Sequence, residues 1–345
     1  MSHLEREIAE QPAVLRRLLE MEQASVAALA EAMRARDVRH VIIAARGSSD
    51  NAATYGKYLL ESFARLPVAL AAPSLFTIYK APPRMAGALV LGISQSGQSP
   101  DIVAVVREAR AQGALTAAIT NEAGSPLADM ADHVIQIRAG VERSVAATKT
   151  YTAQLTALAM LGAALGDEPA RQEELRALPD WLEATIAGSG PAAAAAPRYR
   201  YMESCVVIGR GYNYATAHEI ALKLKELTYV IAEPYSSADF MHGPLALVEH
   251  GFPVLVVAPQ GIMYPEMLNF MDQLRRRDAE LAVISDQPEA LDLAATPLPL
   301  PASAPEWLSP VIAVAPGQVL ALHMTLAKGY DPDHPRGLRK VTETR

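Results

Sequence analysis

The chain has 345 residues, half of them apolar and a fifth charged, which is the balance of a globular protein long enough for two domains. Its 31 Lys and Arg residues against 38 Asp and Glu give a formal charge of −7, which argues against a nucleic-acid-binding protein. The single cysteine, Cys205, lies in an apolar run and cannot form an intrachain disulfide. We expect it to be a small buried side chain in a reducing compartment.

The N-terminal segment is rich in charge. Residues 3–36 have an amphipathic pattern that predicts one or two helices around Pro12, and the charges within residues 1–23 argue against a signal peptide. No apolar run approaches the roughly 20 residues that a membrane-spanning helix needs. We therefore expect a cytoplasmic chain that binds neither membrane nor nucleic acid.

Short apolar runs alternate with helical patterns from residue 41 onward. In the first half, strands are expected at residues 41–45, 88–93, 115–119 and 134–137, and helices at residues 51–63 and 101–111. This alternation predicts parallel strands joined by right-handed helical crossovers. The fold class is therefore α/β, with doubly wound parallel sheets.

The second half repeats the first at a constant offset of 164 residues. The matched pairs are Gly47 with Gly211, Gly97 with Gly261, Ala131 with Ala295, and Gln154 with Gln318. The repeat predicts an internal duplication that gives two tandem subdomains. The expected parts are an N-terminal helical segment (1–36), a first copy (37–183), a linker (184–200), a second copy (201–328) and an irregular C-terminal arm (329–345).

A cluster of hydroxyl groups follows the second strand of the first copy. Ser94, Gln95, Ser96 and Ser99 lie in a loop that ends at an expected helix N-cap, where backbone N–H groups and the helix dipole favour an anion. A phosphate monoester fits this loop, although an ordinary polar loop is the alternative. No dinucleotide or Walker motif accompanies it, so a nucleotide is not indicated. The equivalent loop of the second copy, residues 259–262, lacks the hydroxyl groups, which predicts a single site per chain.

The helix after Gly211 carries three charged residues on one face. Glu219, Lys223 and Glu226 are spaced at i, i+4 and i+7, beside an apolar face. The ordinary interpretation is a solvated face with weak ion pairs. The position of the helix after a strand end, where sites form in such sheets, favours a functional cluster instead.

A polar stretch at residues 233–244 has no counterpart at the same place in the first copy, and long loops of this kind are often functional. It contains His242, which is placed to act as a general acid or base near neutral pH. The other histidines and Cys205 show no metal-ligand spacing. We therefore expect no metal.

Seven stretches spread over nearly the whole chain carry a resemblance. They read EIAEQPAVLRR, ARGSS, SQSGQSPD, ERSVAATKTYTAQL, GRGYNYATAHEIALKLKEL, FMHGPLAL and DPDHPRGLRKV. In order and spacing they resemble the sugar isomerase (SIS) family, most closely the isomerase half of glutamine–fructose-6-phosphate amidotransferases. Free-standing SIS-type glucosamine-6-phosphate deaminases are also similar.

The resemblance implies a role for each matching residue. Ser48, Ser49, Ser94, Gln95, Ser96 and Ser99 would hold the sugar phosphate, with Val145 and Ala147 bordering the sugar. Glu226 would move a proton between C1 and C2, supported by Glu219 and Lys223. His242 would assist ring opening from a neighbouring subunit, which implies a homodimer, and Lys340 would form a Schiff base. The family has a serine where Ala147 stands, so that hydroxyl contact is missing. The resemblance implies no cofactor.

The amidotransferases also carry an N-terminal glutaminase domain with a cysteine nucleophile, which this sequence lacks. We therefore expect deamination, in which glucosamine 6-phosphate and water give fructose 6-phosphate and ammonia. The alternatives are a fructosamine-phosphate deglycase, a plain phosphosugar isomerase, a non-catalytic sugar-phosphate sensor and an ammonia-dependent synthase subunit. Glu226, His242 and Lys340 argue against a sensor, which needs only the phosphate site.

Overall fold

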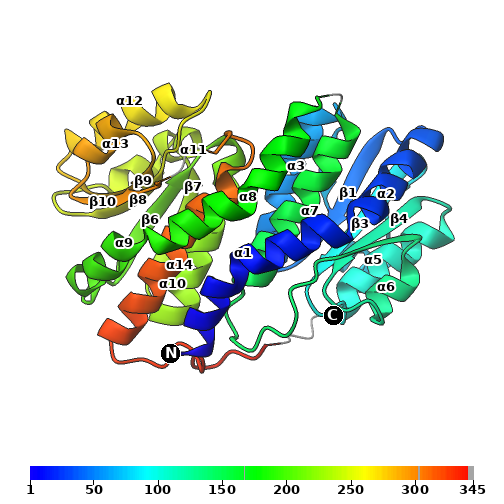
Figure 1. Ribbon diagram of the computed structural model, residues 1–345, viewed down its shortest axis with the longest axis horizontal. Helices are drawn as coiled ribbons and strands as arrows, with labels where there is room; N and C mark the ends of the chain where they lie inside the picture. Colours follow the sequence, from blue (N-terminus) through cyan, green and yellow to red (C-terminus); the bar gives the residue numbers. More distant parts are fainter. Residues whose placement is uncertain (167, 302–303, 341–345) are drawn as a thin grey trace. The chain divides into compact units, whose positions relative to one another are not determined.

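The computed structural model describes residues 1–166, 168–301 and 304–340 (Figure 1). The chain divides into two compact units, which are described separately below. Unit A comprises Ala13–Glu142, Lys149–Arg176 and, among the described residues of the tail, Arg339 and Lys340. Unit B comprises Met1–Pro12, Arg143–Thr148 and Ala177–Leu338.

Unit A is built on a five-stranded parallel sheet in the order β2-β1-β3-β4-β5. Its strands are β1 (His40–Ala44), β2 (Val68–Leu70), β3 (Ala88–Ser94), β4 (Leu115–Thr120) and β5 (His133–Gln136). β3 and β4 are buried throughout, because helices cover both faces of a parallel sheet.

The helices of unit A follow the strands in sequence. They are α2 (Gln23–Ala35), α3 (Ser48–Phe63), α4 (Ser74–Thr77), α5 (Pro100–Ala111), α6 (Pro126–Met130) and α7 (Lys149–Leu165). α7 packs against α2 and α3, and α5 packs on β3 and β4. The amphipathic N-terminal segment forms two helices, as predicted, but α1 (His3–Met21) runs through Pro12 and ends before Glu22.

Unit B repeats the same topology. Its sheet has the order β10-β9-β8-β6-β7, which is the order of unit A read from the other edge. The strands are β6 (Ser204–Gly209), β7 (Ile231–Ser236), β8 (Pro253–Val257), β9 (Glu280–Ser285) and β10 (Thr296–Pro299). The prolines of β10 lie on an edge strand, where a missing N–H donor costs no ladder hydrogen bond.

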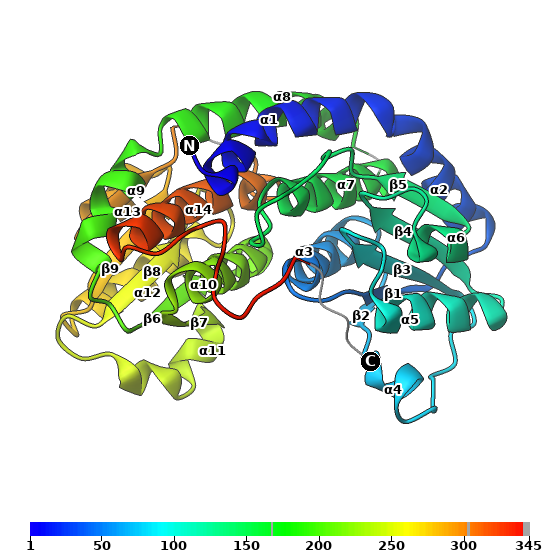
Figure 2. The same ribbon diagram turned by 90° about the horizontal axis from the view of Figure 1, so that it is seen from below.

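The helices of unit B are placed as in unit A. They are α9 (Gly190–Ala195), α10 (Tyr214–Thr228), α11 (Ser237–Met241), α12 (Tyr264–Arg275), α13 (Pro288–Asp292) and α14 (Ser309–Ala327), with 3₁₀ turns η1 (Ala196–Tyr199), η2 (Gly211–Asn213) and η3 (Pro244–Leu247). α10 and α14 lie side by side (Figure 2). The start and end of α12 are 164 residues beyond those of α5, so the predicted duplication is confirmed.

Two segments that were expected to be irregular contain helices or strands in the structure. The segment 184–200, expected as a linker, is helical: α8 (Ala170–Ala187) runs into it, and α9 and η1 follow, because its alanines favour a helix. The polar stretch 233–244 contains the end of β7 and all of α11. The counterparts of β7 and α11 in unit A are β2 and α4. The stretch resembles a loop in sequence because β7 is an edge strand, which tolerates Glu233 and Pro234.

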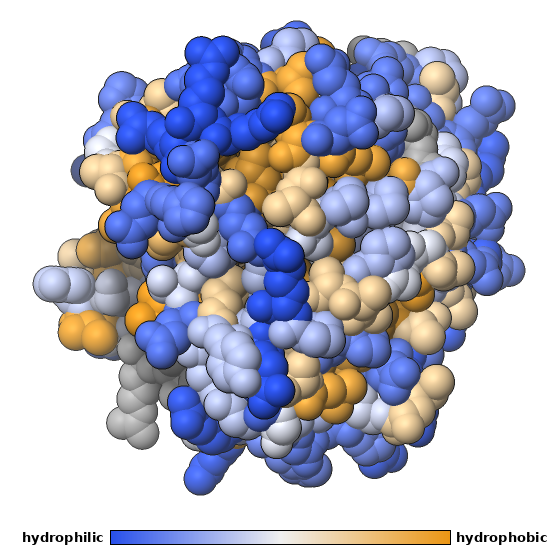
Figure 3. Space-filling model, turned by 90° about the vertical axis from the view of Figure 1, so that its left-hand side faces the viewer, coloured by the Kyte–Doolittle hydropathy of each residue, from blue (hydrophilic) through white to orange (hydrophobic). Residues whose placement is uncertain are grey.

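α14 is the one helix among the described residues that is long and apolar enough to cross a membrane. This differs from the expectation that no apolar run has such a length. In the structure, 78% of its most apolar window is buried, as in the core helix of a globular protein. On the face drawn in Figure 3, apolar side chains form small groups among polar ones.

Candidate functional site

The carboxyl ends of β1 and β3 form the switch point of the unit A sheet. These two strands are neighbours, and the chain leaves them toward opposite edges, so the loops that follow them open side by side. α3 begins at Ser48 directly after β1, and the loop 95–99 joins β3 to α5. The structure therefore brings both predicted phosphate-binding segments to one edge of one sheet.

The loop 94–99 is shaped by its own hydroxyl groups. The Oγ of Ser94 accepts the N–H of Gly97 at 3.2 Å, and the Oγ of Ser96 accepts the N–H of Gln98 at 3.3 Å. Gly97 has a φ of +62°, and a Cβ there would lie 2.0 Å from the Oγ of Ser125. Only glycine therefore fits this turn.

Ser99 occupies the N-cap position of α5, as predicted, with an extended backbone. Its side chain accepts no N–H from the helix, which differs from an ordinary serine cap. The Ser99 hydroxyl and the N–H groups in the first turn of α5 are therefore suited to bind an anionic ligand.

An ion pair that the sequence interpretation missed joins the two loops. The Nε of Arg46 lies 2.9 Å from the Oδ2 of Asp101, whose side chain is fully buried in the first turn of α5. Arg46 itself is half exposed and adds a positive charge at the same sheet edge. Burial raises the pKa of Asp50 in the next helix, and Arg46 opposes that rise. Arg46 lies in the quoted ARGSS motif, so its position was a usable signal.

Ser48 and Ser49 form the first turn of α3. The Oγ of Ser49 accepts the Nε2 of Gln154 from α7 at 3.0 Å, and both side chains are buried. Ser49 is therefore held by packing inside unit A.

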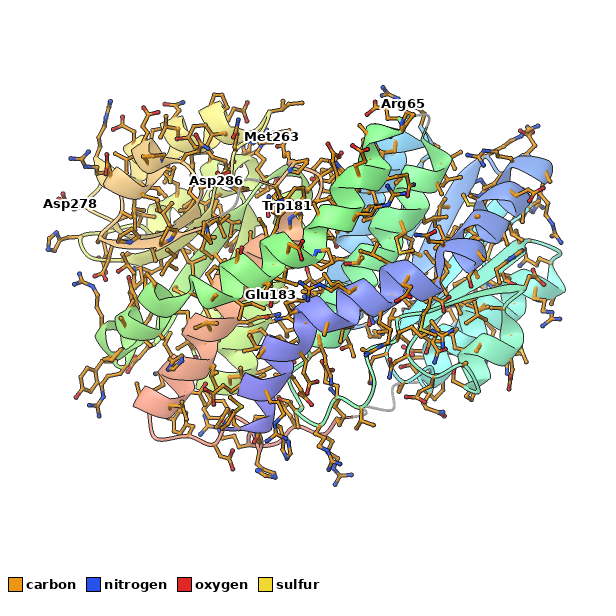
Figure 4. The ribbon with its side chains drawn as sticks, in the orientation of Figure 1. Arg65, Trp181, Glu183, Met263, Asp278 and Asp286 are labelled. Carbon is orange, nitrogen blue, oxygen red and sulfur yellow. The ribbon has the colours of Figure 1, made fainter. Side chains whose placement is uncertain are left out.

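The switch point of unit B differs in one important respect. There the carboxylate of Glu306 accepts the N–H groups of Ile262 at 2.8 Å and Met263 at 3.2 Å, at the start of α12. Asp286 accepts the N–H of Gln260 at 2.7 Å, and Figure 4 shows Met263 and Asp286 at the same end of the sheet. A carboxylate of the chain itself thus occupies the helix N-terminus that corresponds to the hydroxyl loop of unit A.

The three charged residues of α10 form a buried cluster. The Nζ of Lys223 lies 2.6 Å from the Oε2 of Glu226 and 3.3 Å from the Oε1 of Glu219. The side chains of Glu219 and Lys223 are 0% and 1% exposed, whereas that of Glu226 is 22% exposed. The interpretation as a solvated face is therefore wrong, and Glu226 is the member that a ligand can reach.

Electrostatics fix the charge of Lys223. Burial alone would lower its pKa, but the carboxylates of Glu219 and then Glu226 outweigh burial and raise the pKa above the usual lysine range. Lys223 is therefore a permanent cation near neutral pH. It cannot serve as a base, and it supplies a fixed positive charge beside Glu226.

α10 is held in place by a close contact with α14. Gly317 of α14 lies against Ile220, and a Cβ at Gly317 would approach the Cγ1 of Ile220 to 2.5 Å. The helix ends at Tyr229, which has a left-handed backbone. The Tyr229 hydroxyl accepts the N–H of Arg336, whose guanidinium lies 3.9 Å from the ring centroid. The C-terminal arm is thereby fastened to the end of α10.

His242 lies at the C-cap of α11, where its N–H donates to the carbonyl of Asp239. Its side chain is exposed, as are those of Met241 and Leu247 beside it. Within unit B, no described contact brings His242 to the α10 cluster.

Lys340 is paired with a residue that the sequence interpretation did not assign. Its Nζ lies 2.6 Å from the Oε2 of Glu142, and both residues belong to unit A. Glu142 also accepts the N–H of Thr150 at 3.1 Å and its hydroxyl at 2.7 Å. Glu142 opens the quoted ERSVAATKT motif, but spacing alone gave no sign of a partner 198 residues away.

Val145 and Ala147 lie in the short segment Arg143–Thr148, which belongs to unit B. The carboxylate of Glu7, from α1, accepts the N–H groups of Arg143 and Ser144 and fixes the start of this segment. Both predicted sugar-bordering residues are partly exposed. The sequence interpretation did not predict this contact of Glu7.

The predicted residues thus fall into two sets. Unit A holds the serine loops and Lys340, and unit B holds the α10 cluster, His242, Val145 and Ala147. In the part of the chain that the structure describes, no group of three or more His, Cys, Asp or Glu side chains is placed to hold a metal ion. Cys205 is buried in β6, as expected, and burial raises the pKa of its thiol to about 12.

Comparison with known proteins shows what this chain is similar to. A glutamine–fructose-6-phosphate aminotransferase (isomerizing) from Thermus thermophilus is 36% identical over 97% of this chain, which spans 58% of that relative. The crystal structure of a candidate phosphosugar isomerase from Silicibacter pomeroyi matches with a TM-score of 0.87 and 37% identity, over 96% of this chain and 100% of that one.

Two further structures match over nearly the full chain. The C-terminal domain of a glucosamine–fructose-6-phosphate aminotransferase from Francisella tularensis has a TM-score of 0.86 and 29% identity, over 97% of this chain and 98% of that one. A glucosamine-6-phosphate deaminase from Thermotoga maritima has a TM-score of 0.77 over 99% of this chain and 100% of that one. At 20% identity it shows a shared fold alone.

The SIS domain model matches this chain twice, at residues 35–164 and 201–327. These matches contain the two parallel sheets and both copies of the duplication. The chain therefore belongs to the SIS domain family.

Proposed function

We propose that this chain is an aldose–ketose isomerase of phosphosugars that converts glucosamine 6-phosphate and water into fructose 6-phosphate and ammonia. The observation that carries the proposal is the α10 cluster. It presents the partly exposed carboxylate of Glu226 beside the permanent cation Lys223, with Glu219 buried behind them. A carboxylate that a substrate can reach is suited to moving a proton between carbon atoms.

The serine loops of unit A support the choice of a phosphorylated substrate. Hydroxyl groups, the N-terminus of α5 and the guanidinium of Arg46 gather at one sheet edge. These are the groups that bind a phosphate monoester in proteins. We assign phosphate binding to Ser48, Ser49, Ser94, Gln95, Ser96 and Ser99.

The proposed reaction proceeds in four steps. His242 assists opening of the sugar ring, and Glu226 takes a proton from C2 and returns it to C1, which leaves an imine at C2. The amine of Lys340 attacks C2 and displaces ammonia. Water then cleaves the lysine imine and releases fructose 6-phosphate. Glu219 and Lys223 hold Glu226 throughout, while Val145 and Ala147 border the sugar.

One observation favours deamination over glutamine-dependent synthesis by the described chain. The only thiol of the sequence, Cys205, is buried and its pKa is raised to about 12, so it is not an activated nucleophile. Ammonia is therefore the proposed product.

The test is to incubate the purified chain with glucosamine 6-phosphate, without glutamine, and to measure ammonia and fructose 6-phosphate together. We expect equal amounts of both. Glu226→Gln should lower turnover at least about 100-fold, the range of general acid–base catalysis, and keep the affinity for the sugar phosphate. Glu233→Gln is the control, because that carboxylate is half exposed on β7 and pairs only loosely with Lys225, at 3.8 Å.

Other outcomes would overturn the assignment. Full turnover by Glu226→Gln would contradict the role of that carboxylate. Release of a sugar phosphate from a phosphorylated fructosamine, without ammonia from glucosamine 6-phosphate, would identify a deglycase. Tight binding without turnover of either substrate would identify a sensor.

We also propose that the active form is a homodimer in which His242 serves the neighbouring copy. The exposure of His242, with Met241 and Leu247 exposed beside it, supports this arrangement. Mixing the inactive variants His242→Ala and Glu226→Gln should restore activity that neither has alone. If the mixed sample stays inactive although the subunits exchange, His242 acts within its own chain.

A further inference from the structure

Glu142 and Lys340 form an ion pair with very different burial on its two sides. The Glu142 side chain is 0% exposed, whereas that of Lys340 is 25% exposed, and the two charged atoms are 2.6 Å apart. A solvated surface pair would show exposure on both sides. The carboxylate is therefore a fixed feature of the interior of unit A, and the lysine reaches it from the chain's last described residue.

The carboxylate keeps its place independently of the lysine. It accepts the N–H and the hydroxyl of Thr150, the second residue of α7, so it acts as the N-terminal cap of that helix. The positive end of the helix dipole favours a negative charge there. Glu142 therefore provides a preorganised anion toward which Lys340 extends.

Among the described residues, two cations lie close to this pair in the chain. Lys149, at the start of α7, donates its Nζ to the carbonyl of Val141, and the exposed side chain of Arg339 precedes Lys340. Glu142 is a carboxylate that lies 2.6 Å from the Lys340 nitrogen and supplies negative charge to it.

We propose that Glu142 is the counter-ion of the cationic imine that Lys340 forms with a ketose phosphate, and so a positioning residue for Lys340. The inference rests on the proposed function, which assigns the imine to Lys340. The neutral amine attacks the C2 carbonyl and a C–N bond forms. The carbonyl oxygen then leaves as water with one proton from the amine and one from solvent, so the nitrogen keeps one proton and a positive charge. A carboxylate 2.6 Å from that nitrogen stabilises the positive charge.

The counter-ion has a chemical consequence for the sugar. A positively charged imine withdraws electrons from the neighbouring carbons, and a neutral imine does so much less. Glu142 keeps the imine in the charged form toward higher pH, in which water attacks C2 more readily and releases fructose 6-phosphate. The carboxylate acts on the reaction through Lys340 and contacts no substrate atom.

The experiment uses fructose 6-phosphate with cyanoborohydride, which reduces charged imines, and follows the mass of the intact chain from pH 6 to pH 9. In the wild type we expect a stable adduct on Lys340 across this range. In Glu142→Gln, the pH at which the rate of trapping falls should be lower than in the wild type by one unit or more. Trapping in this variant should therefore be about tenfold slower than in the wild type near pH 8.5. Glutamine can still accept the N–H of Thr150, which preserves the cap of α7.

Glu22→Gln is the matched control, because Glu22 is also a buried carboxylate of unit A, 2.6 Å from the guanidinium of Arg138. It should leave the pH dependence of trapping unchanged. Glu142→Asp, which keeps the charge, should restore most of the wild-type profile. Thermal unfolding of each variant checks that the fold is intact.

The outcomes separate the two proposals. If the wild type forms no reducible adduct on Lys340, the imine of the proposed function is wrong. If the wild type forms it and Glu142→Gln shows the same pH profile, the counter-ion role is wrong and Glu142 is a helix cap alone. An equal fall in trapping at every pH also contradicts the counter-ion role, because loss of a charge displaces the profile along the pH axis.

Discussion

Lys223 is a buried cation between two carboxylates, and its removal is expected to cost stability as well as activity. Lys223→Met leaves Glu219 and Glu226 close together without a neutralising charge. Breaking a buried ion pair in this way costs about 3–5 kcal/mol. Urea denaturation at pH 7 measures the loss, and the partial exposure of Glu226 places the expected value at the lower end of that range.

The raised pKa of Lys223 also predicts how this stability depends on pH. When the pKa of a group is higher in the folded chain than in the unfolded chain, its protonation stabilises the fold. This stabilisation is complete below the pKa of the unfolded chain, about 10.4 for lysine. It is lost only as the pH rises through the pKa of the folded chain. The difference between the wild type and Lys223→Met should therefore be the same at pH 6 and pH 9. A difference that shrinks markedly by pH 9 would contradict the assignment of a permanent cation.

Some features of single residues could be predicted from the sequence, and others could not. The spacing of Glu219, Lys223 and Glu226 sufficed to place them on one helix face, because helix geometry is local. The partners Glu142 and Glu306 could not be found in this way. Their contacts join positions that are far apart in the chain, and only the folded topology brings them together.

At the level of elements, the contact between α10 and α14 sets the position of the buried cluster. Gly317→Ala would place a Cβ 2.5 Å from the Cγ1 of Ile220 and push the two helices apart. Overpacking of this kind costs about 1–3 kcal/mol. Because Ile220 follows Glu219 on α10, we expect a loss of turnover as well, measured with the ammonia assay beside thermal unfolding.

Gly190→Ala is the control for this prediction. Gly190 begins α9, and a Cβ there would meet nothing within 4 Å. Alanine at that position should leave stability unchanged or slightly raised, since it favours a helix. Equal effects of the two substitutions would show that the contact with Ile220 does not govern the placement of α10.

The elements themselves followed from the sequence where periodicity was strong. The strands β1, β3, β4 and β5 and the helices α3, α5 and α10 lie where apolar runs and helical spacing predict them. The helical structure of the segment 184–200 was not predicted, because an alanine-rich stretch between Gly and Pro residues resembles a loop in composition while favouring a helix. The edge strand β7 was missed because Glu233 and Pro234 hide its pattern.

For the whole molecule, the duplication raises the question of how many ligands one chain binds. Both sheets have the same strand order and a switch point, yet the two points differ in chemistry. Unit A presents a serine loop there, and unit B presents the carboxylate of Glu306 bound to the start of α12. A phosphate would meet a negative charge at the second point, so we expect only the switch point of unit A to bind it.

This comparison predicts one molecule of fructose 6-phosphate per chain in titration calorimetry. The duplication supplies a matched pair of variants, because Gln260 is the counterpart of Ser96 at the offset of 164 residues. Ser96→Ala removes a hydroxyl from the loop of unit A and should weaken binding about tenfold, the effect of one hydrogen bond to a charged group. Gln260→Ala lies beside the point that Glu306 occupies and should leave both affinity and stoichiometry unchanged. Two equivalents per wild-type chain, or equal losses in the two variants, would show that unit B binds the sugar phosphate as well.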